Sequence, residues 1–161
     1  MLSEEIKNLV GQVFASSVFE VEKESIRRFA DAVGDMNPLY RDAEYAGKSR
    51  YDSIITPPGF ISSVWYWGGS SETTGKELPG MFGLIQSLAD AGYKSTIDSA
   101  IDYEFLEPIY AGDVIRSESV IKDMKERKSE DGGVVFLITD TTYTKENGNI
   151  AAKVRWTTIH R

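Results

Sequence analysis

The sequence contains no cysteine and only one histidine. Without cysteine there can be no disulfide bond, thiolate metal site or cysteine nucleophile, and this composition is usual in the cytosol. His160 stands next to the last residue, and a single histidine in that place predicts a solvated surface group rather than a ligand or a general base. No cluster of histidine with other metal ligands exists, so the sequence predicts neither a metal site nor a cofactor.

Long apolar runs and basic clusters are also missing. No window is apolar over the length of a membrane span, and the first residues lack the basic and apolar regions of a signal peptide. Eighteen basic residues stand against 25 acidic ones, for a net charge of −7. We therefore expect a cytoplasmic protein that binds neither nucleic acid nor membrane. An anionic ligand such as a coenzyme A thioester would need a local basic patch.

The chain length and the absence of linkers and repeats predict a single domain over residues 1–161. Ser3 is a suitable N-cap for a short helix over residues 3–10, and residues 13–21 alternate loosely, as in a strand. Apolar residues spaced by three and four between positions 26 and 33 predict an amphipathic helix, which Gly34 is well placed to end.

The second half of the chain has β character. Four β-rich runs occur, and the first of them alternates apolar and polar residues as a half-buried strand does. Turn signals rich in Gly, Asn and Asp separate the last three, which predicts an antiparallel meander. The runs cover residues 97–105, 114–124, 134–144 and 150–159. The predicted fold class is therefore α+β.

Two neighbouring segments carry the polar residues that could do chemistry. Asp35 and Asn37 follow the end of a predicted helix, where their side chains can point into a cleft, and Pro38 excludes helix at Asn37. Farther along, Thr56 and Pro57 predict the start of a helix that runs to Trp67 and is apolar on nearly all sides, as a buried helix is. Its free N–H groups would favour a carbonyl oxygen or an oxyanion.

A plainer interpretation of the same residues stays open. Asp35 and Asn37 can form an Asx-turn and nothing more, and the two prolines can simply begin a helix. Trp65 and Trp67 can fill a core or an interface. The stretch over residues 68–80 is rich in Gly, Ser and Thr and predicts a loop.

Three motifs in order carry a resemblance to a known family. The first is GD-x-NPLY over residues 34–40, followed by PPGF over residues 57–60. The second is an aromatic pair followed by PIYAGD over residues 108–113, and the third is the stretch 148–156. Together they resemble the MaoC-like dehydratases, and most closely the N-terminal-type, histidine-free subunits of mycobacterial 3-hydroxyacyl dehydratase heterodimers. The resemblance implies a hot-dog fold, an antiparallel sheet wrapped around a buried central helix.

The resemblance also implies a reaction and a set of site residues. Catalytic members carry D-x-N-P-x-H and interconvert 2-enoyl and (R)-3-hydroxyacyl thioesters with an Asp and His pair. Here Asp35 and Asn37 are retained, but Tyr40 occupies the histidine position. A tyrosine is a poor base at neutral pH, although its hydroxyl can donate a hydrogen bond. The candidate catalytic residues are therefore Asp35, Asn37 and Tyr40.

In that family a half without histidine pairs with a half that has one. The implied role here is to bind an acyl-CoA or acyl-carrier-protein thioester, in a homodimer or, preferably, in a heteromer with a histidine-bearing subunit. The candidate substrate-binding residues are Pro57, Pro58, Gly59, Phe60 and Trp65. Two alternatives stay open: a homodimeric thioesterase-type enzyme that uses Asp35, and an acyl-CoA-binding module without catalysis.

Overall fold

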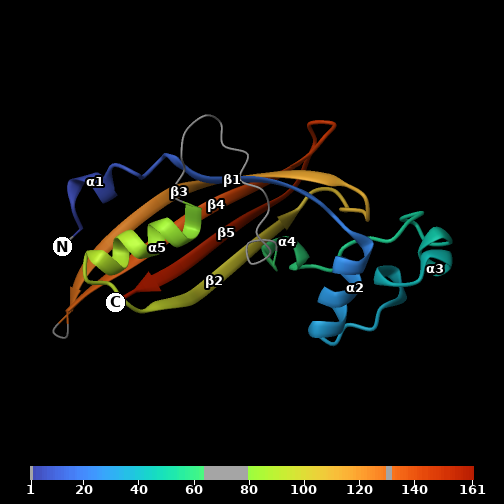
Figure 1. Cartoon of the computed structure of the whole chain (residues 1–161), viewed down its shortest axis with the longest axis horizontal. Coiled ribbons are helices and arrows are strands. Elements are labelled where there is room, and N and C mark those ends of the chain that lie inside the picture. Colours follow the sequence, from blue (N-terminus) through green and yellow to red (C-terminus); the bar gives the residue numbers. More distant parts are fainter. Residues whose placement is uncertain (1, 64–79, 130–131) are drawn as a thin grey trace.

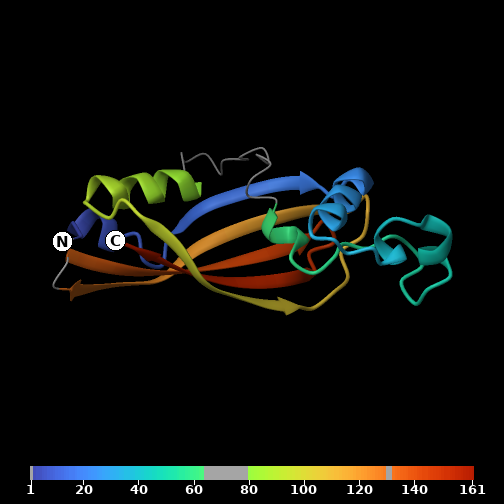
Figure 2. The same cartoon turned by 90° about the horizontal axis from the view of Figure 1, so that it is seen from below.

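A five-stranded antiparallel sheet forms the body of the molecule, and helices cover one of its faces (Figures 1 and 2). The computed structural model describes residues 2–63, 80–129 and 132–161. The helices are α1 (Glu4–Lys7), α2 (Lys23–Ala32), α3 (Ala43–Gly47), α4 (Phe60–Ser63) and α5 (Gly80–Asp90), with a 3-10 turn, η1, at Pro38–Tyr40. The strands are β1 (Val13–Glu20), β2 (Thr96–Phe105), β3 (Val114–Ser129), β4 (Gly132–Lys145) and β5 (Ile150–His160).

The strand order is β1-β3-β4-β5-β2, and every neighbouring pair is antiparallel. The meander predicted for the last three strands is confirmed. β2 lies outside it, because this strand pairs with β5 at one edge of the sheet. The α+β class predicted from the sequence is confirmed as well. No helix among the described residues is long and apolar enough to cross a membrane.

Strand β2 differs from its prediction as a half-buried strand. Apart from Tyr103, which is half-buried, all its residues are exposed, including Ile101 and Phe105. The alternation of apolar residues is present, but a strand is buried only where another layer covers it. β2 has a single strand neighbour because it forms an edge of the sheet, and among the described helices α5 reaches only its first residues (Figure 1). The prediction of half-burial was therefore wrong.

Two buried clusters fill the covered face of the sheet. The motif cluster lies at the end where α2 and α4 pack and includes Ile26, Tyr40, Phe60 and Tyr143. The α5 cluster lies at the end that holds both termini and includes Phe14, Leu84, Leu88, Ile121 and Leu137. Residues of opposite ends of the chain thus meet in each cluster.

Two helix predictions need correction. The helix expected from Pro57 begins at Phe60, because Gly59 has a φ of +84° and cannot continue a right-handed helix. Its expected continuation through Trp65 to Trp67 lies outside the described residues, as does the predicted loop up to residue 79. The helix α5 was not predicted at all. Its only signal was a run of apolar residues after Gly80, beyond the stretch interpreted as a loop.

Candidate functional site

The turn after α2 is held by its own polar side chains. Gly34, with a φ of +73°, ends the helix as predicted, and Asp35 N–H donates to the carbonyl oxygen of Ala30 at 2.8 Å. The Asp35 carboxylate accepts the N–H of Asn37 at 3.0 Å, and the Asn37 side-chain oxygen accepts the N–H of Leu39 at 3.1 Å. Asp35 and Asn37 therefore form the Asx-turns that the plainer interpretation expected. The hydrogen bond from Asn37 N–H also fixes the direction of the half-buried Asp35 carboxylate.

Arg41 fastens this turn to the helix before it. Its Nη2 donates to the backbone oxygen of Asp35 at 2.7 Å, and its Nη1 donates to Asp31 Oδ1 at 2.9 Å. Arg41 Nε is buried and has no hydrogen-bond partner among the described residues. The arrangement holds the Asp35 backbone against α2, so the motif aspartate is positioned by two independent contacts.

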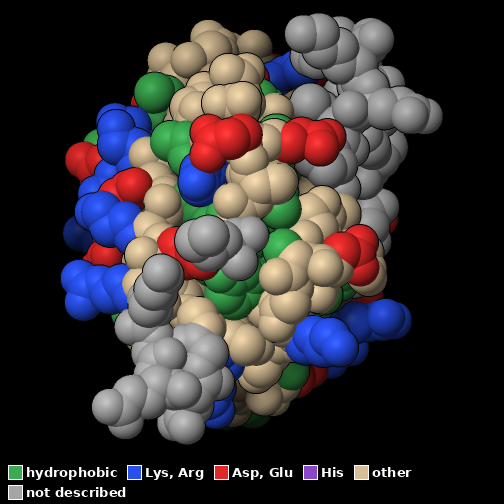
Figure 3. All heavy atoms as spheres, turned by 90° about the vertical axis from the view of Figure 1, so that its left-hand side faces the viewer, with side chains coloured by type: hydrophobic (Ala, Val, Ile, Leu, Met, Phe, Trp, Pro, Cys, Tyr) green, Lys and Arg blue, Asp and Glu red, His purple; other side chains and the backbone are tan. Residues whose placement is uncertain are grey.

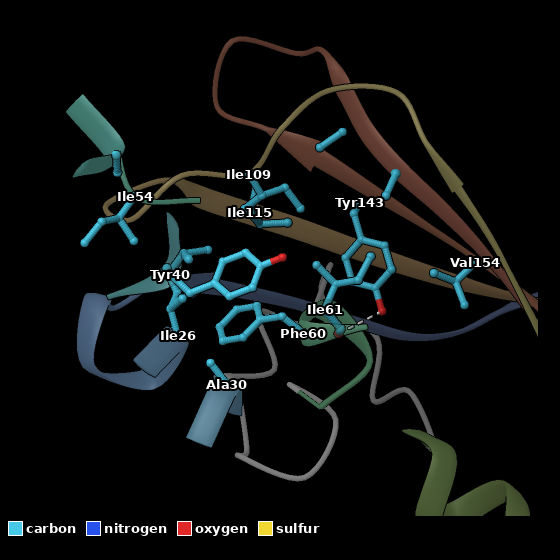
Figure 4. Packing of buried hydrophobic residues seen from close by; sticks show 14 residues of the cluster. Ile26, Ala30, Tyr40, Ile54, Phe60, Ile61, Ile109, Ile115, Tyr143 and Val154 are labelled. Atoms are coloured by element: carbon cyan, nitrogen blue, oxygen red, sulfur yellow. Dashed lines mark hydrogen bonds between the residues drawn. The ribbon is translucent and has the colours of Figure 1, made fainter. Parts of the chain in front are cut away.

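Tyr40 is buried within the motif cluster, and its ring points into that cluster (Figure 4). Burial raises the pKa of the Tyr40 hydroxyl above its usual value, and the negative charge of Asp35 raises it further. The hydroxyl therefore stays protonated at neutral pH. At Tyr40 the chain therefore offers a hydrogen-bond donor and not a base.

The segment with the two prolines is pinned by the PIYAGD motif. Thr56 N–H donates to the carbonyl oxygen of Ile109 at 2.9 Å, and Ala111 N–H donates to that of Ile54 at 3.0 Å. Within the motif, the Asp113 carboxylate accepts the N–H of Tyr110 at 2.9 Å and lies 3.1 Å from Lys145 Nζ. The second motif therefore acts as a support that fixes the Pro57 segment in place.

The turn and the proline segment face a common cavity of about 550 Å³. Asn37, Tyr40, Pro57 and Pro58 contribute to its wall, together with residues 50–51 and 105–109. Asp35, Gly59 and Phe60 are not part of that wall. The structure thus brings together four of the candidate residues, whereas Trp65 lies outside the described residues.

Gly59 and Phe60 instead serve the packing behind the cavity. A Cβ on Gly59 would lie 3.8 Å from the Phe29 ring and from the Tyr103 hydroxyl. Phe60 is buried and meets Phe29 edge to face, with ring centroids 5.7 Å apart. The N–H groups of Phe60 and Ser62 already donate to Pro57 and Gly59 carbonyl oxygens. Their role toward a substrate stays a prediction.

Sequence comparison decides the family. Residues 8–154 match the model of the FAS1-like dehydratase domain region. A "Probable enoyl-CoA hydratase alpha subunit" of Thermomonospora curvata is 30% identical over 134 residues, which are 81% of this chain and 42% of that protein. The chain belongs to the FAS1-like dehydratase-region family. It spans less than half the length of this relative.

Solved structures agree on the fold of this dehydratase-region chain. The ChsH1–ChsH2 complex from Mycobacterium tuberculosis contains a chain with a TM-score of 0.76 and 19% identity, over 97% of this chain and 88% of that one. A chain of the HadBC (3R-hydroxyacyl-ACP dehydratase) complex from the same organism gives a TM-score of 0.64 and 18% identity, over 93% and 99%. The resemblance to MaoC-like dehydratases and the hot-dog fold expected from it are confirmed.

Sequence reasoning missed part of the cavity wall in this dehydratase-region chain. Arg50 and Tyr51 belong to this wall, as do Phe105 and the four residues that follow it. The Arg50 guanidinium lies 4.7 Å from the centre of the Tyr51 ring. A neighbouring arginine and tyrosine in a loop could have indicated a binding site in the sequence. Only the fold, however, places Arg50 and Tyr51 in the same cavity wall as the motif turn. Within the described residues, no group of three or more His, Asp or Glu could hold a metal.

Proposed function

We propose that the chain is the substrate-binding subunit of a hydratase or dehydratase that interconverts 2-enoyl and (R)-3-hydroxyacyl thioesters. A second, histidine-bearing subunit completes its site. The observation that carries this proposal is the burial of Tyr40 in the motif cluster, at the position where the resemblance expects the family's histidine. The relative named an alpha subunit and the two heteromeric complexes with the same fold support it.

The chemistry needs one group that removes a proton and one that returns it. Asp35 is the carboxylate of the motif turn; it lies outside the cavity wall, but its charge acts on Tyr40, which is part of that wall. The Asn37 N–H fixes its carboxylate and Arg41 holds its backbone oxygen. The only histidine of the chain, His160, lies at the far end of β5. The histidine that works with Asp35 must therefore come from a partner, while Tyr40 and Asn37 line the pocket as hydrogen-bonding groups.

Strand β2 offers the surface for that partner. It forms one edge of the sheet, so its outer backbone groups have no strand beside them among the described residues. Its apolar side chains are also exposed: Ile97 at 40%, Ile101 at 37% and Phe105 at 51%. An exposed apolar edge strand is a site for strand addition or subunit contact. Phe105 belongs both to this edge and to the cavity, so a partner here would reach the site.

The cavity suits an acyl thioester. Its wall combines apolar residues such as Pro57, Ile55 and Phe105 with the exposed cation Arg50. Each methylene buried there contributes about 0.8 kcal/mol, and Arg50 supplies a local positive charge for a phosphate of the carrier. In a chain of net charge −7, an anionic thioester needs a local basic group, and Arg50 is such a group.

Turnover tests the proposal directly. The chain is assayed with crotonyl-CoA, alone and with a histidine-bearing MaoC-like subunit, following double-bond absorbance and free thiol in the same samples. We expect no turnover from the chain alone and hydration in the mixture, with no thiol release. Hydration by the chain alone that Asp35→Asn abolishes would contradict the need for a partner. Thiol release would favour the thioesterase alternative, and tight binding without turnover in any mixture would favour the binding module.

A further inference from the structure

A second cavity lies beside the α5 cluster. It has a volume of about 170 Å³ and lies between α5 and the ends of β2 and β5. Met81 and Ile85 of α5 and Trp156 of β5 contribute to its wall. A cavity of roughly 150 Å³ lined by apolar side chains is large enough to hold a benzene ring. The space is therefore sufficient for the end of an organic ligand.

The polar end of this cavity is formed by the only histidine of the chain. His160 is fully buried, which corrects the prediction of a surface group, and no histidine is visible at this end of the molecule (Figure 3). Its Nε2 lies 2.8 Å from the Thr158 hydroxyl and its Nδ1 lies 3.1 Å from the Thr96 hydroxyl. Pairing of β5 with β2 places Thr96 opposite His160, and Thr158 precedes His160 by two residues on β5. This side-chain set plays no part in the hydration site.

The hydrogen bonds among His160, Thr96 and Thr158 leave one threonine hydroxyl hydrogen without an acceptor among the described residues. A neutral imidazole donates through one nitrogen and accepts through the other. One threonine hydroxyl therefore donates to the ring, and the other accepts from it and keeps its own hydrogen. In either tautomer, no described residue accepts that remaining hydrogen. Thr158 is buried, whereas Thr96 is exposed outside the cavity that both residues line. On the cavity side, a hydroxyl with an unused donor favours a ligand that brings an acceptor oxygen.

The two cavities share one face of the same pair of strands. Ala152 is opposite Phe105, which lines the first cavity, and Trp156 is opposite Ile101 and lines the second. Opposed residues of an antiparallel pair project to the same side. Four residues separate Ala152 from Trp156, which corresponds to roughly 13 Å at about 3.3 Å per residue. A long or ring-containing acyl group can span this distance, whereas a short one cannot.

We infer that the second cavity binds the far end of a long acyl group and selects one that carries a neutral oxygen, a hydroxyl or a carbonyl. This inference rests on the proposed acyl-thioester function and adds the substrate class to it. Asp98, which also lines the cavity, can accept a hydrogen bond from a terminal hydroxyl. It repels a terminal carboxylate, so the expected order of affinity is hydroxyl, then methyl, then carboxylate.

The single histidine provides the readout. The full chain, prepared without a polyhistidine tag and labelled with ¹⁵N-histidine, gives one pair of ring signals, from His160. We expect ω-hydroxydecanoyl-CoA to shift these signals and butanoyl-CoA to leave them unmoved. By calorimetry, ω-hydroxydecanoyl-CoA should bind about two- to tenfold more tightly than decanoyl-CoA, the effect of one hydrogen bond. The ω-carboxy analogue should bind most weakly.

Variants connect that preference to the cavity. The double substitution Thr96→Val and Thr158→Val keeps the side-chain shapes and should abolish the preference for the hydroxyl. Met81→Trp fills the cavity from α5 and should weaken decanoyl-CoA binding without affecting butanoyl-CoA, which keeps the inference testable if the double variant does not fold. Thr157→Val is the matched control, because Thr157 neighbours Thr158 on the opposite face of β5.

Failure of this inference and failure of the proposed function are separate outcomes. Equal affinities for the hydroxyl and methyl probes, with unmoved ring signals and intact hydration in the two-subunit mixture, would overturn the inference alone. Ring shifts and a hydroxyl preference with no hydration by any mixture would overturn the proposed reaction alone.

Discussion

The two buried clusters are built in opposite ways. The motif cluster joins α2, short helices and turns to the sheet, and it contains tyrosines, such as Tyr143, whose hydroxyl donates to the Ile61 carbonyl oxygen at 3.2 Å (Figure 4). The α5 cluster is mainly aliphatic and lies between an 11-residue helix and long strands. Turns have little stability of their own, so at the motif end tertiary contacts must fix the backbone that carries Asp35 and Pro57.

This contrast separates two tasks. At the motif end, packing positions functional groups, so damage to the packing should affect stability and substrate binding together. At the α5 end, packing supports the sheet, so damage there should affect stability first. Substitutions in the two clusters test the distinction, because both clusters include residues of the central strands β3 and β4.

The largest effect is expected from Phe60→Ala. Phe60 is buried and packs edge to face on Phe29, so its removal leaves a cavity directly behind the site. We expect a loss of about 3–5 kcal/mol in the free energy of unfolding, measured in urea. The affinity of the folded variant for acyl-CoA should also fall. Unchanged affinity would show that the pocket does not depend on this packing.

Leu84→Ala should cost somewhat less. Leu84 is fully buried at the centre of the α5 cluster, and a leucine truncated in such a place costs about 2–5 kcal/mol. Urea unfolding and short-chain acyl-CoA affinity are measured as for Phe60→Ala. Here the affinity of the folded fraction for butanoyl-CoA should be unchanged. A fall in that affinity equal to that of Phe60→Ala would remove the proposed division of tasks.

A smaller loss is expected from Gly133→Ala, next to the α5 cluster. A Cβ on Gly133 would lie 2.9 Å from the Tyr93 hydroxyl and 3.0 Å from its ring, and Tyr93 is held by a 2.6 Å hydrogen bond to Glu126. Overpacking of this kind costs about 1–3 kcal/mol, measured by thermal or urea unfolding.

Gly47→Ala provides the control for Gly133→Ala. At Gly47 the nearest atom to a new Cβ is the Asp52 carbonyl oxygen at 4.0 Å. Gly47 is also helical, so alanine there should be neutral or stabilising by up to about 1 kcal/mol. If Gly133→Ala lowered the free energy of unfolding no more than Gly47→Ala does, Tyr93 would be able to move away from the new Cβ without cost.

Local patterns predicted the elements that carry their own signal. The Ser3 N-cap accepts the Ile6 N–H, Gly34 ends α2, and Asn-Gly closes the last hairpin, as the sequence indicates. The Asx-turn at Asp35 was also visible, because it depends on residues two positions apart. The resemblance to a family added the hot-dog fold, which is confirmed, and a role for the motif, which stays a prediction.

The rest depends on contacts between distant residues. Burial of His160 comes from its pairing with Thr96, which is 64 positions away, and no local pattern reports that. The exposure of β2 follows from its place at the sheet edge, whereas its alternation is that of a buried strand. Arg50 and Phe105 line the same cavity because the segments that follow them are hydrogen-bonded to each other. Thr56 N–H donates to Ile109 of the PIYAGD motif, and Ala111 N–H of that motif donates to Ile54.

The smallest effect is expected from the titration of His160 beside the α5 cluster. Burial lowers its pKa below the usual value of 6.5. Between the two pKa values the unfolded chain binds more protons than the folded chain, so stability falls as the pH drops below about 6.5. Above that pH this contribution is fully present. The His160→Gln variant can keep both threonine hydrogen bonds, but glutamine does not titrate. The stability of this variant should therefore lack the pH dependence that protonation of His160 causes in the wild type.

Other ionisable groups of the chain also contribute to the pH dependence of stability. The informative quantity is therefore the difference in unfolding free energy between wild type and His160→Gln, measured from pH 7.5 to pH 5. That difference should be constant above about pH 6.5. Below this pH the wild type should lose stability relative to His160→Gln. Parallel curves over the whole range would mean that His160 is equally easy to protonate in the folded chain, and the ring would then be open to water rather than enclosed by α5 and β2.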